Sequence, residues 1–386
     1  MNGSPPTGLG IVGCGYIADS YAAAARLHAD ALAIVCVHDR RPERQDAYSR
    51  FWGFRAAPDL DALLGDPGVE IVVNLTDPEN HEAVTLRALA AGKHVYSEKP
   101  LAMTAAGAER VAQAAREAGL RLAGAPCNLL GEHVQTLWRA VRAGVAGPIR
   151  LIYAEMDDGM VHRAPYRDWS NRSGAPWPAR GEFEVGCTFE HAGYTLTALV
   201  AMFGPVRRVT AFAHLCMPDK ATDPPLPHPA PDMSVACLEF DGGVVARMTN
   251  SVVAPYDHRL RLIGEGGVLS VAEPWRYDSP VRFAPTPTTR IGRLLERRLG
   301  YTPARTLAPA RRPPFRPGRG MPAMDFMRGV RELADAIRED RPCRLSPELA
   351  VHVSEVTEAA QHPERFALPH AVRSSAPPIE PMPWGL

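Results

Sequence analysis

The 386-residue sequence predicts an α/β protein with an N-terminal doubly wound parallel sheet and a C-terminal α+β domain built on a large, mainly antiparallel sheet. Three observations lead to this fold class. The chain is long enough for two domains, each with its own core. Strand-like and helix-like runs alternate up to about residue 127, and strand-like runs then follow one another directly. We therefore expect one domain at residues 1–127 and a second at residues 128–386.

The N-terminal half opens with an apolar run, glycines and an Ala-rich segment, LGIVGCGYIADSYAAAARLH, which is typical of a strand, a tight turn and a helix. Further β-branched or apolar runs are LAIVCVHD, VEIVVNLTD, HVYSEKP and RLAGAPCN. The segments HEAVTLRALAAGK and TAAGAERVAQAAREAG, which separate the last three of these runs, have the composition of helices. Alternation of this kind predicts a parallel sheet with helices on both faces.

The C-terminal half begins with a predicted helix, EHVQTLWRAVRAG, and a predicted strand, IRLIYAEMDD. Four strand-like runs come later and are joined by short turn signals: VRRVTAFAHLC, MSVACLEFD, GVVARMTNSVV and RLRLIGEGGVLSV. Short connections between consecutive strands predict antiparallel pairing. Two late helical segments, PAMDFMRGVRELADAIRED and PELAVHVSEVTEAAQ, are expected to cover one face of this sheet.

Two stretches of the second half predict loop-rich insertions. Residues 223–232 are rich in proline, and residues 286–319 are dense in Arg and Pro. Within the second insertion, RIGRLLERRLG has the pattern of a basic amphipathic helix, and we interpret it as a solvated surface segment.

Composition points to a small-molecule partner. Lys plus Arg and Asp plus Glu number 43 each, so no net charge attracts nucleic acid or an anionic membrane. Seven cysteines are scattered singly, which indicates a reducing compartment, and no His or Cys spacing predicts a metal site. The N-terminus MNGSPPTG lacks the pattern of a signal peptide, and no apolar run is long enough to span a bilayer. These features predict a soluble, cytoplasmic protein.

A glycine motif follows the first predicted strand. Gly13, Gly15, Tyr16 and Ile17 belong to the pattern G-x-G-x-x-A, which ends at Ala18 and opens the first helix. Gly13 permits the tight turn, Gly15 allows close approach of a pyrophosphate, and Ala18 keeps helix and strand close together. The helix N-terminus offers free N–H groups to phosphate. The motif in this context predicts a Rossmann-type dinucleotide site.

The second predicted strand ends at Asp39, where a carboxylate can accept hydrogen bonds from the hydroxyls of the adenosine ribose. This favours NAD as cofactor. Arg40 and Arg41 come next, and a guanidinium at this position can pair with the 2′-phosphate of NADP. NADP therefore stays open as an alternative.

The segment GKHVYSEKPLA, together with the glycine motif and Asp39, resembles the Gfo/Idh/MocA family of two-domain NAD(P)-dependent enzymes. The resemblance implies that Lys99 lies beside the nicotinamide and the substrate hydroxyl. It also implies an open-faced sheet in the second domain that forms a homodimer or homotetramer interface. The residues argue independently for Lys99, because the carboxyl end of a strand in a doubly wound sheet faces the ligand crevice. Its ammonium can stabilise alkoxide charge, and Glu98 can orient it or contact the nicotinamide ribose.

The family resemblance implies a second catalytic element, a helix with the pattern D-x-x-x-H. In GCTFEHAGYTLTALVAMFGPV, Glu190 and Tyr194 stand where the Asp and His are expected. Residues four apart share a helix face, so both can reach one substrate. We expect Lys99 to lower the pKa of Tyr194 towards the working range. His191 is the alternative acid or base.

Further residues of the predicted site follow from the same resemblance and from local composition. The resemblance implies cofactor contacts in the LTDPENH segment and beyond it: Thr76, Pro78, Asn80, His81 and Asn128. The polar and aromatic stretch HRAPYRDWSNRSGAPWPARGEFE suits a sugar, since hydroxyls need donors and apolar sugar faces stack on rings. Its candidate substrate contacts are Tyr166, Arg172 and Trp177.

The sequence thus predicts an enzyme that transfers a hydride between NAD and a carbinol or keto carbon of a sugar, cyclitol or related polyol. Lys99, Glu190 and Tyr194 are both catalytic and substrate-contacting in this hypothesis, and no metal takes part. One alternative is a glycoside hydrolase or lyase that keeps NAD tightly bound and oxidises its substrate transiently. Another is a non-catalytic nucleotide-binding regulator, which the presence of Lys99 disfavours.

Overall fold

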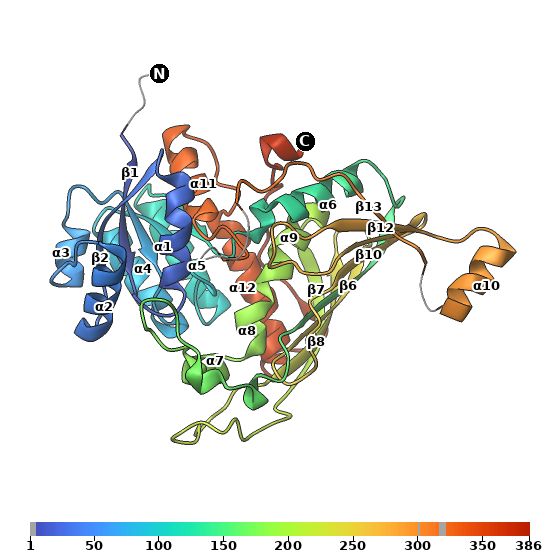
Figure 1. The fold of residues 1–386 in the computed structure, drawn as a ribbon, viewed down its shortest axis with the longest axis horizontal. Coiled ribbons are helices and arrows are strands. Elements are labelled where there is room, and N and C mark those ends of the chain that lie inside the picture. The colour runs from blue at the N-terminus through green and yellow to red at the C-terminus, as the bar shows by residue number, and fades with distance from the viewer. Residues whose placement is uncertain (1–4, 300–301, 316–321) are drawn as a thin grey trace.

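The computed structural model describes residues 5–299, 302–315 and 322–386. Two sheets with their helices lie side by side, and the N-terminal sheet is at the left of Figure 1. Of the segments interpreted above, residues 1–4, 300–301 and 316–319 lie outside the described residues. Within the described part of the chain, none of the helices combines the length and the apolarity needed to cross a membrane.

The first sheet is parallel, and its five described strands run in the order β2-β1-β3-β4-β5. Both faces are covered: Ile71 and Val73 pack into one apolar cluster, whereas Val72 between them packs into another. The strands are β1 (Thr7–Val12), β2 (Leu32–His38), β3 (Ile71–Asn74), β4 (His94–Ser97) and β5 (Leu122–Gly124). The helices are α1 (Ala18–Ala25), α2 (Pro42–Trp52), α3 (Leu60–Leu64), α4 (His81–Ala90) and α5 (Ala105–Glu117).

The chain passes from β1 to β2 on one side of the sheet and later to β3 on the other. Such a reversal of strand order opens a crevice at the carboxyl ends of the strands, where doubly wound proteins bind ligands. The predicted Rossmann-type first half is confirmed.

The second sheet has nine described strands in the order β13-β12-β11-β10-β6-β9-β8-β7-β14. Neighbours pair antiparallel except β6 and β9, which are parallel because three helices separate β6 from the meander that ends in β9. The mainly antiparallel prediction is confirmed. The strands are β6 (Ile149–Asp157), β7 (Val206–His214), β8 (Met233–Phe240), β9 (Val245–Ser251), β10 (Leu260–Gly264), β11 (Gly267–Val271), β12 (Val281–Pro285), β13 (Arg305–Thr306) and β14 (His370–Ala371).

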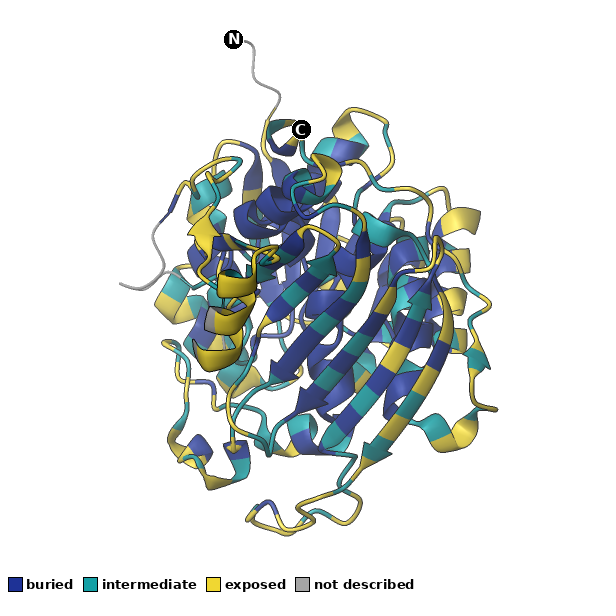
Figure 2. Ribbon diagram, turned by 90° about the vertical axis from the view of Figure 1, so that its right-hand side faces the viewer, coloured by how far each residue is buried: buried dark blue, intermediate teal, exposed yellow. Residues whose placement is uncertain are grey.

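One face of the second sheet is covered and the other is open. Helices α6, α8 and α12 contact the covered face. The open face turns towards the viewer in Figure 2, where buried residues alternate along the strands with half-buried and exposed ones. The helices of this half are α6 (Glu132–Arg142), α7 (Ala179–Val185), α8 (Cys187–His191), α9 (Gly193–Phe203), α10 (Arg290–Leu299), α11 (Arg328–Arg338) and α12 (Pro347–Gln361).

The two late helices do not both cover the second sheet. Helix α12 lies between the sheets and contacts α5 and β5 as well as β7 and β8. Helix α11 packs instead against β4 and β5 of the first sheet, so its predicted position was wrong. Gly329 permits this packing, because a Cβ atom there would lie 2.4 Å from the Tyr96 hydroxyl. Helices α11 and α12, late in the chain, thus contact the first sheet. The boundary between two domains after residue 127 is therefore a proposal.

The two insertions differ in structure. Residues 223–232 form a loop between β7 and β8, as expected. The region 286–319 contains α10 and β13, and α10 is the predicted basic helix. This helix projects from the body of the molecule at the right of Figure 1.

Candidate functional site

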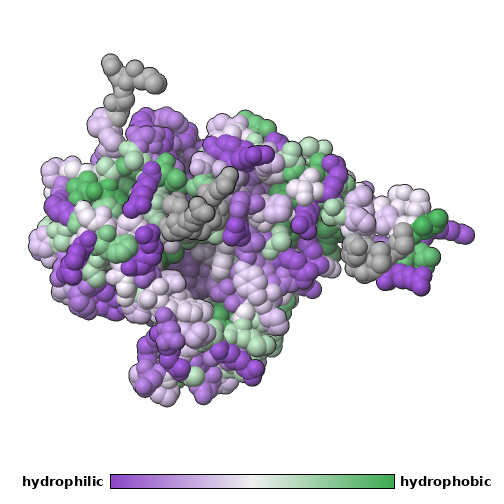
Figure 3. Space-filling view, viewed as in Figure 1, coloured by the Kyte–Doolittle hydropathy of each residue, from purple (hydrophilic) through white to green (hydrophobic). Residues whose placement is uncertain are grey.

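A cavity of about 450 Å³ lies where the carboxyl ends of β1, β3 and β4 face the helices of the second domain. A hollow between the two halves of the molecule is visible near the middle of Figure 3. The cavity wall combines Lys99 from the first domain with Glu182, Glu190, His191 and Tyr194 from the second. The structure thus brings the predicted catalytic residues together.

A smaller cavity of about 120 Å³ adjoins the first one, and Gly15 and Thr76 line both. Gly13 has a φ of +102°, and a Cβ atom there would lie 2.5 Å from the Leu75 carbonyl oxygen. A Cβ atom on Gly15 would meet open space, which leaves room over the turn for a phosphate group. The glycine turn therefore fits a dinucleotide.

Asp39 lines the smaller cavity at the end of β2. Its Oδ2 accepts a hydrogen bond from the Cys14 N–H at 2.7 Å, and its Oδ1 accepts one from the Arg41 N–H at 2.8 Å. These bonds fix the carboxylate beside the glycine turn, where it can still accept ribose hydroxyls. The side chain of Arg40, by contrast, is exposed and pairs with Asp77 at 3.0 Å.

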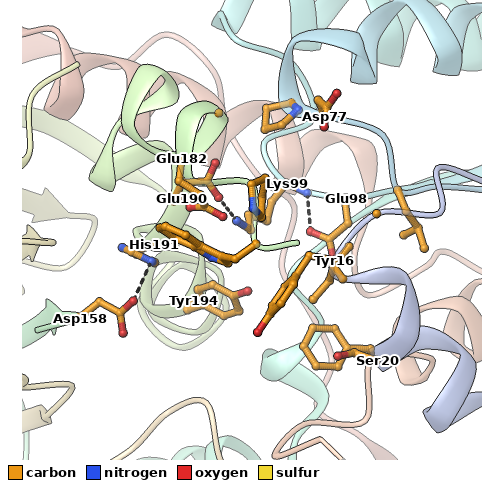
Figure 4. Close-up of a pocket in the computed structure, with 18 of the residues that line it drawn as sticks. Tyr16, Ser20, Asp77, Glu98, Lys99, Asp158, Glu182, Glu190, His191 and Tyr194 are labelled. Carbon is orange, nitrogen blue, oxygen red and sulfur yellow. Dashed lines mark hydrogen bonds and ion pairs between the residues drawn. The ribbon is translucent and has the colours of Figure 1, made fainter. Parts of the chain in front are cut away.

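Lys99 lies two residues after the end of β4. Its ammonium forms an ion pair with the Glu190 carboxylate (Figure 4). The Glu98 Oε2 accepts the Lys99 backbone N–H at 2.9 Å, and the Glu98 Oε1 accepts the Tyr21 hydroxyl at 2.6 Å. Burial alone would lower the pKa of Lys99, but Glu190 and its neighbours outweigh burial and raise the pKa above its usual value. The lysine is therefore a fixed cation in this cavity.

Tyr194 lies one helical turn beyond Glu190, across a short break at Ala192 between α8 and α9. The Lys99 Nζ is 5.9 Å from the centroid of its ring. Burial raises the pKa of Tyr194 well above its usual value, and the attraction of Lys99 is too weak to offset this. Our expectation that Lys99 brings the pKa of the phenol into the working range was wrong. Tyr194 therefore keeps its proton and can donate a hydrogen bond.

His191 also lines the cavity, so the site contains both candidates for the acid or base. Its Nε2 lies 3.8 Å from the Asp158 Oδ2. Burial, with smaller contributions from Lys99 and His258, lowers the pKa of His191 to about 3. The imidazole is therefore neutral near neutral pH, and it can receive a proton only transiently.

Sequence reasoning missed several residues of the cavity wall, among them Glu182 on α7, Asp158 after β6, and Trp275 after β11. Burial and the neighbouring Glu190 raise the pKa of Glu182 to about 8. The Trp275 ring packs edge-on against Tyr194, with centroids 5.2 Å apart. Asp158 directly follows strand β6, as Asp39 directly follows β2. The same signal could therefore have identified Asp158.

The other predicted cofactor residues lie around the two cavities. Most of them line the larger one: Tyr16, Ile17, Thr76, Pro78, His81 and Glu98. Asn80 and Arg40 line the smaller one. Asn128 is fully buried behind the site, and its amide donates to the Tyr194 carbonyl oxygen at 2.5 Å. It therefore holds α9 in place, and its predicted contact with the cofactor has no support in this geometry.

Of the three predicted substrate contacts in the 162–184 stretch, only Trp177 lines the cavity. Tyr166 is buried beneath it, with ring centroids 5.7 Å apart, and donates its hydroxyl to the Lys220 carbonyl oxygen. The Arg172 guanidinium lies over the rings of Phe51 and Trp52, on the outside of the first domain. Tyr166 is drawn away from the cavity by packing within the second domain, and Arg172 by its contact with α2.

Residues 169–178, which we call the strap, cross from the second domain to the glycine turn. The Asn171 amide donates hydrogen bonds to the carbonyl oxygens of Gly15 and Tyr16, each at 3.1 Å. The Ser173 N–H donates to Asp19 on α1 at 2.8 Å. The strap therefore fastens the second domain directly over the turn that fits the pyrophosphate.

The fold and the site define a dinucleotide-binding oxidoreductase. Residues 7–124 match the model of an oxidoreductase family with an NAD-binding Rossmann fold, and residues 134–270 match the GFO/IDH/MocA C-terminal domain. The chain belongs to this family, as the resemblance predicted, and the predicted class of cofactor is confirmed.

Two relatives and one solved structure illustrate the similarity. Inositol 2-dehydrogenase of Acidothermus cellulolyticus is 40% identical over 114 residues, which is 29% of this chain and only 33% of the relative. Trans-1,2-dihydrobenzene-1,2-diol dehydrogenase of Oryctolagus cuniculus is 26% identical over 62% of this chain and 68% of the relative. The structure of aldose-aldose oxidoreductase from Caulobacter crescentus superposes with a TM-score of 0.72 at 21% identity, covering 93% of this chain and 98% of that one.

Proposed function

We propose that the protein transfers a hydride between NAD and a carbinol or keto carbon of a sugar, cyclitol or related polyol. The observation that carries this proposal is the Lys99–Glu190 ion pair in a cavity that adjoins the dinucleotide cavity. A fixed cation at that place can stabilise the negative charge that develops on a substrate oxygen. The Glu190 carboxylate orients the ammonium and is itself 5% exposed.

The residues around the smaller cavity fit NAD better than NADP. The glycine turn would hold the pyrophosphate, Asp39 the adenosine ribose, and Thr76 and Pro78 the nicotinamide end. When bound, the nicotinamide supplies a hydride acceptor or donor. Asp39 would repel a 2′-phosphate, and the nearest following guanidinium, that of Arg40, is engaged with Asp77.

In this proposal Lys99 and Tyr194 donate hydrogen bonds to the substrate oxygen, and His191 takes up or returns the proton of the substrate hydroxyl. The ammonium and the phenol both carry protons in this site and can donate hydrogen bonds to the oxygen. The neutral His191 can accept the hydroxyl proton during oxidation and return one during reduction. Tyr194 in the role of base stays the alternative.

The cavity wall suits a polyol. Trp177, Trp275 and Tyr194 offer ring faces for the apolar side of a sugar or cyclitol. Glu182, Asp158 and Lys99 offer acceptors and donors for hydroxyl groups. The printed names of the relatives, an inositol dehydrogenase and an anhydrofructose reductase among them, agree with this substrate class.

A second candidate function has support from the strap. Because Asn171 and Ser173 fasten it over the glycine turn, a dinucleotide could stay bound through many turnovers. A hydrolase or lyase that oxidises its substrate only transiently would need such retention. It would consume substrate without net production of NADH.

We also propose that the protein is a cytoplasmic homodimer or homotetramer. The open face of the second sheet offers a surface for self-association, and its half-buried residues include the apolar Val235. All seven cysteines are free in the described structure, as expected in a reducing compartment.

The proposed function is tested by absorbance at the NADH band for the purified protein with each cofactor and a panel of sugars, amino sugars and inositols. Reduction of NAD by at least one polyol is expected. Consumption of a glycoside without NADH would favour the hydrolase or lyase instead.

A further inference from the structure

Three titratable side chains, Asp158, His258 and Glu273, form a row that leads away from His191 at the cavity wall. The Asp158 Oδ2 lies 3.8 Å from the His191 Nε2, and the Asp158 Oδ1 lies 3.6 Å from the His258 Nε2. The His258 Nδ1 lies 3.1 Å from the Glu273 Oε1. Asp158 is the one member of this row that lines the cavity, and its side chain is 27% exposed.

His258 is held in a fixed orientation. It is 1% exposed and packs between the rings of Tyr256 and Trp275, with centroids 4.2 Å and 4.4 Å away. Glu273 is itself held, because it accepts hydrogen bonds from the Tyr256 hydroxyl and from the backbone N–H of Trp275. Since the Glu273 carboxylate accepts the proton of Nδ1, the Nε2 of His258 presents a lone pair, and this atom has no hydrogen-bond partner among the described residues.

Several groups of the cavity wall are unsuited to keep the proton that the substrate hydroxyl loses. The raised pKa values of Lys99 and Tyr194 show that both already carry their protons. Glu182, with a pKa of about 8, is protonated at neutral pH as well. His191 can accept a proton, but a pKa of about 3 means that it must pass the proton on.

We propose that Asp158, His258 and Glu273 form a proton-holding site that takes up the substrate proton through His191 during oxidation and returns it during reduction. This inference rests on the proposed function, which supplies the hydride acceptor. His191 and Asp158 would contact the substrate or the migrating proton, whereas Glu273 is a positioning residue that acts through His258.

The transfer balances without a further reactant. The substrate O–H bond breaks and an N–H bond forms at the His191 Nε2. That proton moves to the Asp158 carboxylate and then to the His258 Nε2, which gives an imidazolium between two carboxylates. The proton returns by the same path and passes to water once the product leaves the cavity. The hydride of the same carbinol goes to the bound nicotinamide, as in the proposed function.

Carboxyl groups surround His258. The carboxyl groups of Asp157, Asp158 and Glu273 lie close enough to interact with it electrostatically. Lys99, across the cavity, is the nearby cation that interacts with Asp158 and His191. Burial raises the pKa of Asp158 to about 6, which suits a group that must both take up and release a proton near neutral pH.

The test is single-turnover stopped-flow absorbance of hydride transfer, with NAD and a polyol that the wild-type protein oxidises. The variants are His258→Gln, which can still bond to Glu273 but cannot hold a proton, and Asp158→Asn. His352→Gln serves as the control, because His352 is equally buried but lies far from this row, against β7 and Ser374. Imidazole is added in increasing concentration to each protein.

In the wild-type and His352→Gln proteins the rate should not depend on imidazole. In His258→Gln and Asp158→Asn it should fall at least tenfold and be restored by imidazole, with KM for the polyol nearly unchanged in His258→Gln. A wild-type rate in His258→Gln, or a loss that imidazole does not restore in either variant, would overturn the inference. Absence of hydride transfer to NAD with every polyol in the wild-type protein would contradict the proposed function itself.

Discussion

Lys99 at the end of β4 and Glu190 on α8 form an ion pair that joins the two domains at the cavity. Both side chains are largely buried, with 18% and 6% of their surfaces exposed. Loss of one partner would leave the other as an uncompensated charge in a poorly solvated place. The same contact therefore fixes the approach of the domains and the position of the cation.

Replacement of Asp39 by Asn should shift the cofactor preference. The amide keeps the shape of the side chain but removes the charge that repels a 2′-phosphate. We expect kcat/KM for NADP to rise relative to that for NAD by about tenfold or more, which corresponds to roughly 1.4 kcal/mol. Steady-state kinetics with both cofactors measures this ratio, and Asp46→Asn on the exposed side of α2 is the matched control. An unchanged ratio would remove Asp39 from the adenosine site.

Replacement of Asn171 by Ala should speed release of the dinucleotide. The amide makes two hydrogen bonds to the glycine turn, and each is worth about 1 kcal/mol. We expect the rate of NADH release to rise by roughly tenfold or more, as measured by stopped-flow fluorescence. The exposed Asp168, just before the strap, provides Asp168→Ala as control. Equal release rates in the wild-type and Asn171→Ala proteins would show that the strap does not retain the cofactor.

Replacement of Glu182 by Gln should change how stability depends on pH. The folded pKa of about 8 lies above the ordinary value of 4.5, so the unfolded chain loses this proton first as pH rises. The wild-type protein therefore loses stability between about pH 4.5 and pH 8, and the Gln variant avoids this loss. We expect the Tm of the variant relative to that of the wild-type protein to increase by about 2 to 4 °C from pH 5 to pH 8.5, as measured by thermal unfolding.

The control for this comparison is Glu184→Gln on the same helix, where the side chain pairs with Arg180. It should show no growing advantage at high pH. A Tm difference between the Glu182→Gln and wild-type proteins that is the same at both pH values would mean that Glu182 ionises normally.

The roles of His191 and Tyr194 can be separated by conservative variants. His191→Gln removes the proton acceptor, and we expect kcat to fall by about 10² to 10⁴. Tyr194→Phe removes one hydrogen bond to the substrate oxygen, and we expect a loss of about tenfold. Steady-state kinetics on the same polyol measures both. A larger loss in Tyr194→Phe would return the acid or base role to the tyrosine.

The parts of the site that the sequence predicted are those set by local geometry. Gly13 and Asp39 follow strands directly, and a parallel sheet brings the carboxyl ends of its strands to one crevice. Lys99 likewise lies near the carboxyl end of a strand, two residues after β4. Helix periodicity likewise placed Glu190 and Tyr194 on one face, although the helix is broken between them at Ala192.

The parts that could not be predicted depend on tertiary packing. Asp158, Glu182 and Trp275 reach the cavity only because β6, α7 and the segment after β11 meet there. The strap's contacts with the glycine turn and with α1 span more than 150 residues of sequence. The pKa values of Lys99 and Tyr194 are set by a balance of burial and charge that the sequence does not give. Helix α11 was misplaced because its packing against Tyr96 depends on a single glycine.

The central claim is that Lys99 is the cation of a hydride-transfer site. Its most direct test is the rate of NADH formation, followed by absorbance, in the wild-type and Lys99→Met proteins on the polyol that the wild-type protein oxidises best. Lys93→Met is the control, because the Lys93 ammonium donates to the carbonyl oxygens of Asp66 and Val69, away from the cavity. We predict that kcat falls by about 10³ or more in Lys99→Met, since a preorganised charge at the reacting oxygen is lost, and that it is nearly unchanged in Lys93→Met. A Lys99→Met protein that is folded, binds NAD and turns over at the wild-type rate would contradict the claim.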